Sequence, residues 1–203
     1  MGGIGFLLVI ILYIVGSAAL VAKAPTLKYK IVALLAVLLI PTADAVYGRY
    51  KLNQMCEAEG GLKVYRVAQG VEGFMASSTD EFMLNKYGFQ FSEGESSPRK
   101  YYRFSKQNDS IVIEENVTPK SKYRLFQTYG DDKSVYRRSQ YSIEDISSGE
   151  VLATDIRLTF KGGWAERFLA KFSDAGVGNV AWCSDNPYPE VRIENLITNT
   201  LKH

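Results

Sequence analysis

Two apolar runs within the first 47 residues differ from the rest of the chain. Residues 2–22 carry no charge, and residues 31–47 contain a single one, at Asp44. As helices these runs would measure about 31 Å and about 26 Å, against a bilayer core of about 30 Å. The pattern predicts a transmembrane helical hairpin with spans over 2–22 and 31–47 and a link over 23–30. Pro41 is expected to kink the second span or to mark the start of its last turn.

Both runs also fit other kinds of segment. The first run resembles the core of a signal peptide, with cleavage after Ala24, although its Met-Gly-Gly start lacks a basic residue. In the second run, Ala43-Asp44-Ala45 has the small-x-small form of a cleavage site, so cleavage after Ala45 stays an alternative. A buried hairpin in a soluble protein is the third alternative, which the composition of the remaining chain disfavours.

The charges around the hairpin predict its orientation. The link carries three lysines, Lys23, Lys28 and Lys30. Positive residues in short loops stay in the cytoplasm, so the link is expected inside and residues 48–203 outside, which in a Gram-negative bacterium is the periplasmic side of the inner membrane. Arg49 and Lys51, just beyond the second span, act in the opposite direction.

Residues 48–203 are dominated by short segments that are typical of antiparallel strands. A series of five antiparallel strands is expected, over 100–105, 110–115, 123–129, 134–143 and 151–160, each followed by turn residues. Two shorter strand-like runs precede them, over 62–68 and 89–91. In the last one, apolar positions such as Leu152 and Ile156 alternate with polar ones such as Asp155, which predicts one buried and one solvated face. Residues 92–99 are expected to form a loop because they contain Gly94 and Pro98.

Helical periodicity is expected at both ends of this domain. Helices are predicted over 50–59, over 164–174 and after Pro189, and a capping box at Ser78 and Glu81 predicts a short helix that ends at Gly88. The chain is therefore expected to be α+β: a two-helix transmembrane hairpin (1–47) followed by an antiparallel β-meander domain with flanking helices (48–203).

Charge and size narrow the choice of partners. The chain has 24 basic and 22 acidic residues, and three lysines and one acid lie before residue 47, so the remaining part is formally neutral. A neutral domain gives no argument for nucleic acid as a partner. The expected partners are the lipid bilayer and a protein of the envelope, and the domain is large enough for one core.

The chain has two cysteines, Cys56 and Cys183, near the two ends of the domain. In an oxidising compartment they are natural disulfide partners. The alternative is two unrelated thiols, one of them buried as a small apolar side chain.

The residue types of the sequence give little support for catalysis or metal binding. The single histidine, His203, is the last residue, so Ser-His-Asp, Cys-His and His-Cys zinc arrangements are disfavoured. The sequence has no phosphate-binding glycine motif. We therefore predict no catalytic residue, no cofactor and no metal. Adjacent acids such as Glu114-Glu115 are interpreted as solvated charge.

Two local features suggest contact or turn residues. Aromatic and basic side chains alternate on the predicted strands, and Gly162-Gly163-Trp164 joins the last strand to the next helix. The candidates are Tyr102, Arg103, Arg137, Arg138, Gly162, Gly163 and Trp164. Tyrosine and arginine suit a protein or glycan contact, but cross-strand tyrosines with solvated arginines explain the pattern as well. The glycines suit either a ligand loop or a sharp strand-to-helix turn with positive φ, in which Trp164 anchors the helix on the sheet.

These elements also carry a resemblance. The residues that carry it are the cysteine before Gly60-Gly61, the strand Leu62-Lys63-Val64-Tyr65, the turn from Asp145 to Leu152, Gly162-Gly163-Trp164 and the closing Cys183. At these positions the chain resembles a group of small, uncharacterised bacterial proteins with membrane-anchored periplasmic domains. The matching positions are scattered over residues 52–183. The resemblance implies a bacterial origin and pairing of the two cysteines, and it implies no activity.

Three functions are compatible with this picture. The first is a non-enzymatic interaction or accessory subunit of a bacterial envelope assembly. The second is an immunity-like protein that neutralises a periplasmic toxin. The third is a cell-wall hydrolase that uses carboxylates, because acidic residues are plentiful in the chain.

Overall fold

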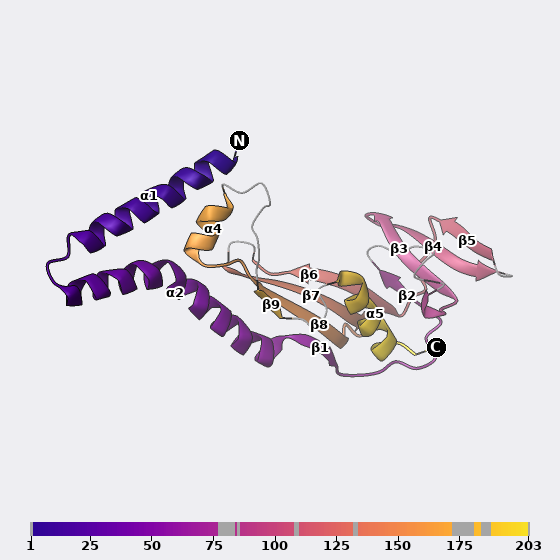
Figure 1. Cartoon of the computed structure of the whole chain (residues 1–203). Helices are drawn as coiled ribbons and strands as arrows, with labels where there is room; N and C mark the ends of the chain where they lie inside the picture. Colours follow the sequence, from indigo (N-terminus) through magenta and orange to yellow (C-terminus); the bar gives the residue numbers. More distant parts are fainter. Residues whose placement is uncertain are drawn as a thin grey trace. The chain divides into compact units, whose positions relative to one another are not determined.

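The computed structural model shows a mixed α+β protein with a large sheet and several helices, as the sequence predicts. It describes residues 2–76, 84, 86–107, 110–131, 134–171, 181–183 and 188–202. The chain divides into two compact units. The first unit comprises Met1–Ala58, Asp131–Arg137 and Leu158–Cys183, and the second comprises Glu59–Gly130, Arg138–Arg157 and Ser184–His203. Figure 1 follows the elements along the chain.

The first unit contains the two apolar runs as helices α1 (Gly2–Ala22) and α2 (Leu27–Glu59). The carbonyl of Thr26 accepts a hydrogen bond from the Lys30 N–H at 3.0 Å, so α2 begins directly after the Pro25-Thr26 turn. The non-helical link is thus shorter than the predicted 23–30. The helix expected separately over 50–59 is the last part of α2, because no proline follows Pro41 before Gly60.

Helix α2 bends where Pro41 was expected to kink it. The segments Leu27–Val37 and Thr42–Glu59 meet at 49°. Among the described helices, none taken alone is long and apolar enough to cross a membrane. The two segments of α2 together satisfy that test by length and composition, and the apolar stretch Ile11–Ala22 of α1 is shorter.

The second half of α2 packs against strand ends that belong to the same unit. Leu52 is 1% exposed. Gly48 lies directly against Phe160: a Cβ at Gly48 would come within 2.1 Å of the Phe160 ring. The Tyr136 hydroxyl donates to the Gly48 carbonyl at 3.2 Å, and its ring lies 5.4 Å from that of Phe160. The absence of a side chain at Gly48 therefore allows the close approach of this helix to the two aromatic rings.

The described strands form a nine-stranded sheet with the order β1-β8-β7-β6-β2-β3-β4-β5, and β9 pairs with β8. The strands are β1 (Gly61–Val64), β2 (Gly73–Ala76), β3 (Phe91–Ser97), β4 (Lys100–Gln107), β5 (Ser110–Glu115), β6 (Tyr123–Tyr129), β7 (Tyr136–Asp145), β8 (Val151–Phe160) and β9 (Ala181–Cys183). The five predicted strands are confirmed as β4 to β8, with bounds that differ by two residues or fewer.

The expectation of a simple meander is correct only in part. Strands β3, β4 and β5 are antiparallel neighbours, and so are β6 and β7. Between these groups lies β2, which pairs in parallel with both β3 and β6. Its four residues are almost wholly buried, so they show no alternation of apolar and polar positions.

The loop predicted over residues 92–99 is wrong. Strand β3 extends to Ser97, and Ser97 pairs with Lys100, so the turn is confined to Pro98 and Arg99. Arg99 has a positive φ of 67°. The segment is polar in sequence, yet Ser92 and Glu93 are 1% and 0% exposed. The polar composition suggested a loop. The hydrogen-bond partners that allow Glu93 to be buried lie far away in the sequence, so no local signal reveals them.

The solvated face predicted for β8 is wrong at Asp155, which is buried, whereas Arg157 and Thr159 are partly exposed. Helix α5 (Pro189–Thr200), expected after Pro189, buries Leu196 and Ile197 in the core of the second unit. Its Arg192 donates to both oxygens of Asp155, at 3.0 and 2.9 Å. Asp155 is 5% exposed and the neighbouring Ala153 is 0% exposed. An ion pair with a covering helix thus takes the place of water at this face.

The remaining helix, α4 (Trp164–Ala170), belongs to the first unit and begins where it was predicted. Residues 172–174, over which the same helix was expected to continue, lie outside the described residues, as do Ser78 and Glu81 of the predicted capping box. Leu84, Lys86 and Tyr87 of the helix expected there are helical.

Candidate functional site

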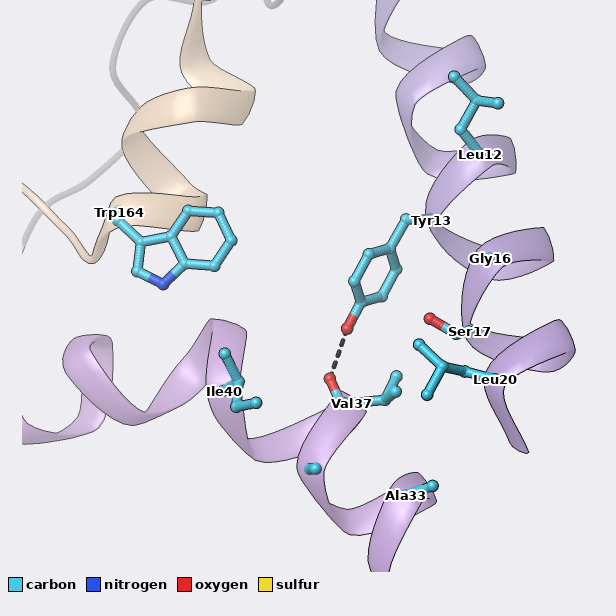
Figure 2. A pocket seen from close by; sticks show the side chains of 10 residues that line it. Leu12, Tyr13, Gly16, Ser17, Leu20, Ala33, Val37, Ile40 and Trp164 are labelled. Atoms are coloured by element: carbon cyan, nitrogen blue, oxygen red, sulfur yellow. Dashed lines mark hydrogen bonds between the residues drawn. The ribbon is translucent and has the colours of Figure 1, made fainter. Parts of the chain in front are cut away.

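A polar contact joins the two helices of the hairpin. Pro41 has no N–H, so the carbonyl of Val37, four residues earlier, lacks its usual helical donor. The Tyr13 hydroxyl of α1 donates a hydrogen bond to this carbonyl (Figure 2). A residue of the first helix thus satisfies the acceptor that the proline of the second helix leaves open.

A groove of about 460 Å³ lies between the same helices. Figure 2 shows Tyr13 crossing it from α1 to α2, and Trp164 of α4 lying beside it. The lining is apolar or small: Leu12, Tyr13, Gly16, Ser17, Leu20, Ala33, Ala36, Val37, Ile40 and Trp164. The two apolar runs therefore leave an open apolar surface between them.

The single acid of the apolar runs, Asp44, joins α2 to the start of α4. Its Oδ2 accepts a hydrogen bond from the Trp164 N–H at 2.5 Å. Gly163 packs so closely that a Cβ there would lie 2.6 Å from Asp44 Oδ1 and 2.9 Å from the Ala45 Cβ. Oδ1 is buried, with no hydrogen-bond partner in the described part of the chain. The predicted glycine turn thus brings the backbone of α4 against the end of the second apolar run.

A second contact strengthens this junction. Gly162 has a φ of 88°, which confirms the positive φ expected in the strand-to-helix turn. Glu166 accepts the Gly163 N–H at 2.8 Å and pairs with Arg49 of α2 at 2.5 Å. One carboxylate therefore closes the turn and binds the helix to which the turn is docked.

The expectation that Trp164 anchors α4 on the sheet is wrong. Its side chain is 48% exposed and lies beside the hairpin groove. The glycines that precede it turn the backbone toward Asp44, so the indole points to the apolar helices. Gly162 and Gly163 are themselves buried, and a ligand-contacting role for the three residues stays a prediction.

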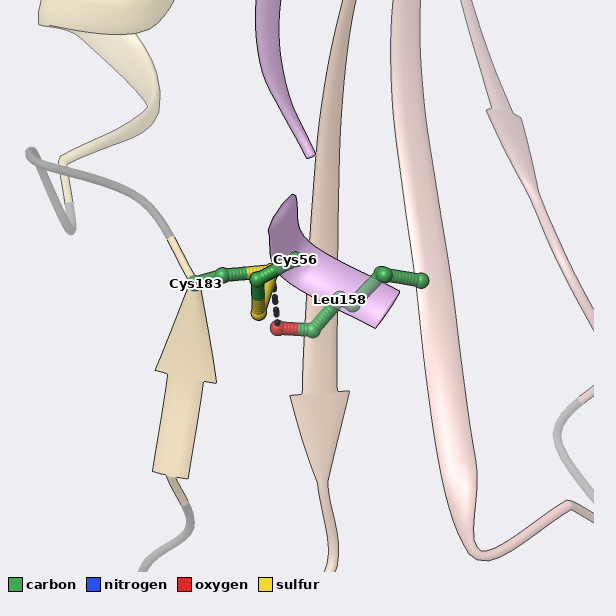
Figure 3. The surroundings of a disulfide bond; sticks show 3 residues. All are labelled: Cys56, Leu158 and Cys183. Atoms are coloured by element: carbon green, nitrogen blue, oxygen red, sulfur yellow. Dashed lines mark hydrogen bonds between the residues drawn. A yellow bond between two sulfur atoms is a disulfide. The ribbon is translucent and has the colours of Figure 1, made fainter. Parts of the chain in front are cut away.

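Cys56 and Cys183 form a disulfide, with their Cα atoms 5.5 Å apart. The bond joins the last turns of α2 to strand β9, which pairs with β8, and the Cys183 sulfur lies 3.7 Å from the Leu158 carbonyl (Figure 3). Because the two residues are 127 positions apart, the bond closes a long loop. The predicted disulfide is thus confirmed, and it fixes a short strand to the helix that extends from the apolar run.

Tyr102 and Arg103, two candidate contact residues, have structural partners in the second unit. The Tyr102 ring covers Gly94, where an added Cβ would lie 2.3 Å from it, and stands edge-on to Phe104 at 5.7 Å. Arg103 donates to Glu93 from Nε at 2.8 Å and from Nη2 at 2.6 Å. Arg103 is therefore paired within the sheet rather than solvated, and the tyrosine occupies a cross-strand position.

Glu93 is the main site-like feature that sequence reasoning missed. Besides Arg103, it accepts the Lys120 N–H and both the N–H and hydroxyl of Ser121, at 3.1, 2.9 and 2.5 Å. Burial acts to raise the pKa of the Glu93 carboxyl, but these hydrogen bonds outweigh it and hold the pKa below its usual range. The cluster ties residues 118–121 to the sheet, and no local sequence signal identifies it.

The other two candidates fall in different units. Arg138, in the second unit, pairs with Glu59 at 2.6 Å and with Gln140 at 3.1 Å. Arg137, in the first unit, is exposed. The arginines thus have distinct surroundings, and a contact role for them stays a prediction.

Comparison with protein-family models, with curated proteins and with solved structures found no match. Within the described ranges, no three His, Cys, Asp or Glu side chains gather in a way that would hold a metal ion. The best-defined candidate site is therefore the hairpin together with its junction to α4, all within the first unit.

Proposed function

We propose that this protein is anchored in a bacterial inner membrane by α1 and α2 and carries its sheet domain in the periplasm. There it serves as a non-enzymatic interaction or accessory subunit of an envelope assembly. The observation that carries the proposal is the uncovered apolar surface of the hairpin. Side chains on both helices are half or more exposed: Leu8, Ile11, Leu12, Ile14, Val15, Leu20, Leu27, Ile31, Val32, Leu34, Leu35, Leu39, Ile40 and Val46.

A surface of this kind requires an apolar environment. Soluble monomers rarely expose contiguous apolar patches of more than a few hundred Å², because each Å² left in water costs about 25 cal/mol. Helices satisfy their own backbone groups, which is what the bilayer core demands. The Tyr13 bond to Val37 supports the same environment, since an unsatisfied carbonyl is costly in lipid.

Charge and redox chemistry support the orientation. Lys23 lies in the turn between the helices and Lys28 and Lys30 lie at the start of α2, where positive residues favour the cytoplasmic side. The Cys56–Cys183 disulfide lies at the opposite end of α2, and such bonds persist in oxidising compartments such as the periplasm. Both features favour a domain outside the cytoplasm.

The anchorage is tested by thiol labelling in intact cells. In Ala24→Cys, the new thiol in the link is expected to resist a membrane-impermeant maleimide until the cells are lysed. In the matched Ser148→Cys variant, an exposed residue of the domain should be labelled without lysis. Labelling of Ala24→Cys from outside, or release of the chain by alkaline carbonate, would contradict the proposal.

The accessory role is tested by purification from the native host in a mild detergent. A constant molar ratio to one envelope protein through two chromatographic steps is expected. A chain that elutes alone from native membranes, at the size of one copy in its micelle, would remove the accessory role while leaving the anchorage intact.

A further inference from the structure

Helix α4 is attached to α2 at a defined level, where the apolar run ends. Its first residue donates to Asp44, its preceding glycine packs on Ala45, and its Glu166 pairs with Arg49. Asp44 and Arg49 bracket the transition from the apolar run to the charged second half of α2, in which Arg49 and Lys51 follow Tyr47. The attachment therefore places α4 beside the boundary between the apolar and polar parts of that helix.

The exposed side chains of α4 have the character of residues at a membrane surface. Trp164 is 48% exposed and Phe168 is 43% exposed. Residues four apart lie on one face of a helix, so the two rings form one apolar strip. Basic residues accompany the strip, with Lys161 before it, Arg167 within it and Lys171 after it. Tryptophan is enriched at membrane–water interfaces, because its ring is apolar and its N–H is polar. Basic side chains are attracted to anionic lipid headgroups.

Continuity with the hairpin distinguishes lipid from other occupants. Trp164 lines the same groove as Leu12 and Ile40, which belong to the apolar runs. An environment that covers these runs therefore reaches the indole without interruption. A protein partner would have to cover both the strip and the adjoining helices, whereas a bilayer surface does so by its geometry.

We propose that α4 is an interfacial anchor, whose Trp164 and Phe168 side chains insert into the outer headgroup region of the bilayer beside the hairpin. The inference rests on the proposed membrane anchorage and adds a lipid contact made by the domain itself. Through Asp44 and the disulfide, this contact holds α4 and the second half of α2 in a constant position relative to the membrane surface.

The test uses the two tryptophans of the full chain as depth probes. Trp182→Phe leaves Trp164 as the single tryptophan, and Trp164→Phe leaves Trp182 as the matched control. Trp182 precedes Cys183, whose partner Cys56 lies about 18 Å beyond Asp44 along α2, at about 1.5 Å per residue. The Trp182 side chain is 44% exposed, so a soluble quencher can reach it.

Both variants are reconstituted into vesicles of phosphatidylcholine and phosphatidylglycerol that contain lipid brominated near the headgroup or near the chain end. The expected result is loss of most Trp164 emission with the shallow bromine, a smaller loss with the deep one, and little loss for Trp182. Acrylamide should quench Trp182 more than Trp164. A triple variant, with Trp164→Phe, Phe168→Trp and Trp182→Phe, should show the same shallow quenching.

The outcomes separate this inference from the proposed function. If the chain floats with vesicles and resists carbonate but Trp164 is quenched only by acrylamide, the interfacial anchor is wrong and the membrane anchorage stands. If Trp164 is shielded only at high protein density in the vesicles, a second copy covers the strip and the lipid contact is again wrong. If the chain does not float, the anchorage itself fails, and this inference fails with it.

Discussion

In the second unit, apolar side chains from β2, β6, β7, β8 and α5 cover one another, so that Phe74, Ile143 and Leu196 are at most 1% exposed. In the first unit, the largest apolar surface lies on α1 and α2 and is exposed. What holds the first unit together is a set of separate contacts: the disulfide, the Gly48–Phe160 approach, and the Asp44 and Glu166 junction with α4. The second unit is thus stabilised by a continuous hydrophobic core, and the first unit by separate local contacts.

The carboxylates of the two units show the same contrast. Glu93 has donors on both oxygens, and Asp155 receives two bonds from Arg192. Asp44 has one backbone donor, and its second oxygen is buried with no partner among the described residues. A buried charge that is fully paired avoids the large cost of an uncompensated charge. The first unit thus combines an exposed apolar surface with a half-satisfied acid.

Removing the disulfide should produce the largest change, and it should be confined to the first unit. For the double variant Cys56→Ser and Cys183→Ser, the chain-entropy model gives a loss of about 5 kcal/mol for a loop of this length. We expect faster hydrogen exchange in 42–58 and 181–183, with protection in β3 to β6 retained, as measured by mass spectrometry in detergent. The untreated wild-type chain should show no titratable thiol before or after denaturation. Equal loss of protection in both units would contradict the contrast.

Breaking the Glu93 cluster should weaken the second unit by a smaller amount. In Glu93→Gln, the Arg103 guanidinium loses its buried counter-charge, so the free energy of unfolding at neutral pH should fall by about 3 kcal/mol. Denaturant unfolding followed by near-ultraviolet circular dichroism measures it. Glu150→Gln, at the exposed Arg66–Glu150 pair, is the matched control, with an expected change below about 1 kcal/mol.

The same cluster has a predictable pH dependence. The hydrogen bonds keep the pKa of Glu93 in the folded chain below its unfolded value, so its contribution is present above the unfolded pKa. That contribution is lost as the pH falls through the lower, folded pKa. The difference in stability between wild type and Glu93→Gln should therefore shrink as the pH falls below about 4. A difference that grows in acid would show that the carboxylate does not stabilise this unit.

Two glycines of the first unit should respond oppositely to alanine. At Gly48 the added Cβ would collide with the Phe160 ring, so Gly48→Ala is expected to destabilise the unit by about 2 kcal/mol. At Gly16, the control, an added Cβ would meet no atom within 4 Å beyond the neighbouring backbone of its own helix, and alanine should favour the helix by about 1 kcal/mol. Thermal unfolding of the full chain in detergent measures both. If the two variants shift the midpoint of thermal unfolding equally, the close contact of α2 with Phe160 does not stabilise the first unit.

Much of the fold could be predicted from local sequence patterns. Strands β4 to β8 were predicted because each is bounded by turn residues and has a regular alternation or aromatic content that a half-buried strand requires. The bend at Pro41 was predicted because proline removes a helical hydrogen bond whatever its surroundings. Strand β2 was missed because its burial on both faces leaves no alternation to detect.

For the candidate site, only the residue types could be predicted from the sequence. Gly162-Gly163-Trp164 predicted a turn with positive φ, which Gly162 adopts, but not the direction in which the turn leads. Trp164 points to the hairpin because Asp44, 120 residues earlier, accepts its N–H. Likewise Glu93 could not be recognised as buried, since its donors lie 10, 27 and 28 positions away.

The sequence by itself determined the two apolar helices, the bend in α2, five strands and the only possible disulfide, because periodicity, proline and a count of two cysteines are local or compositional properties. The tertiary structure alone decided that β2 lies between two antiparallel groups, that Asp155 and Glu93 are buried ion-pair partners, and that α4 docks on Asp44 at the end of the apolar run. Each of these depends on hydrogen-bond donors or apolar surfaces brought from distant positions, and a polar residue is buried only where such partners arrive.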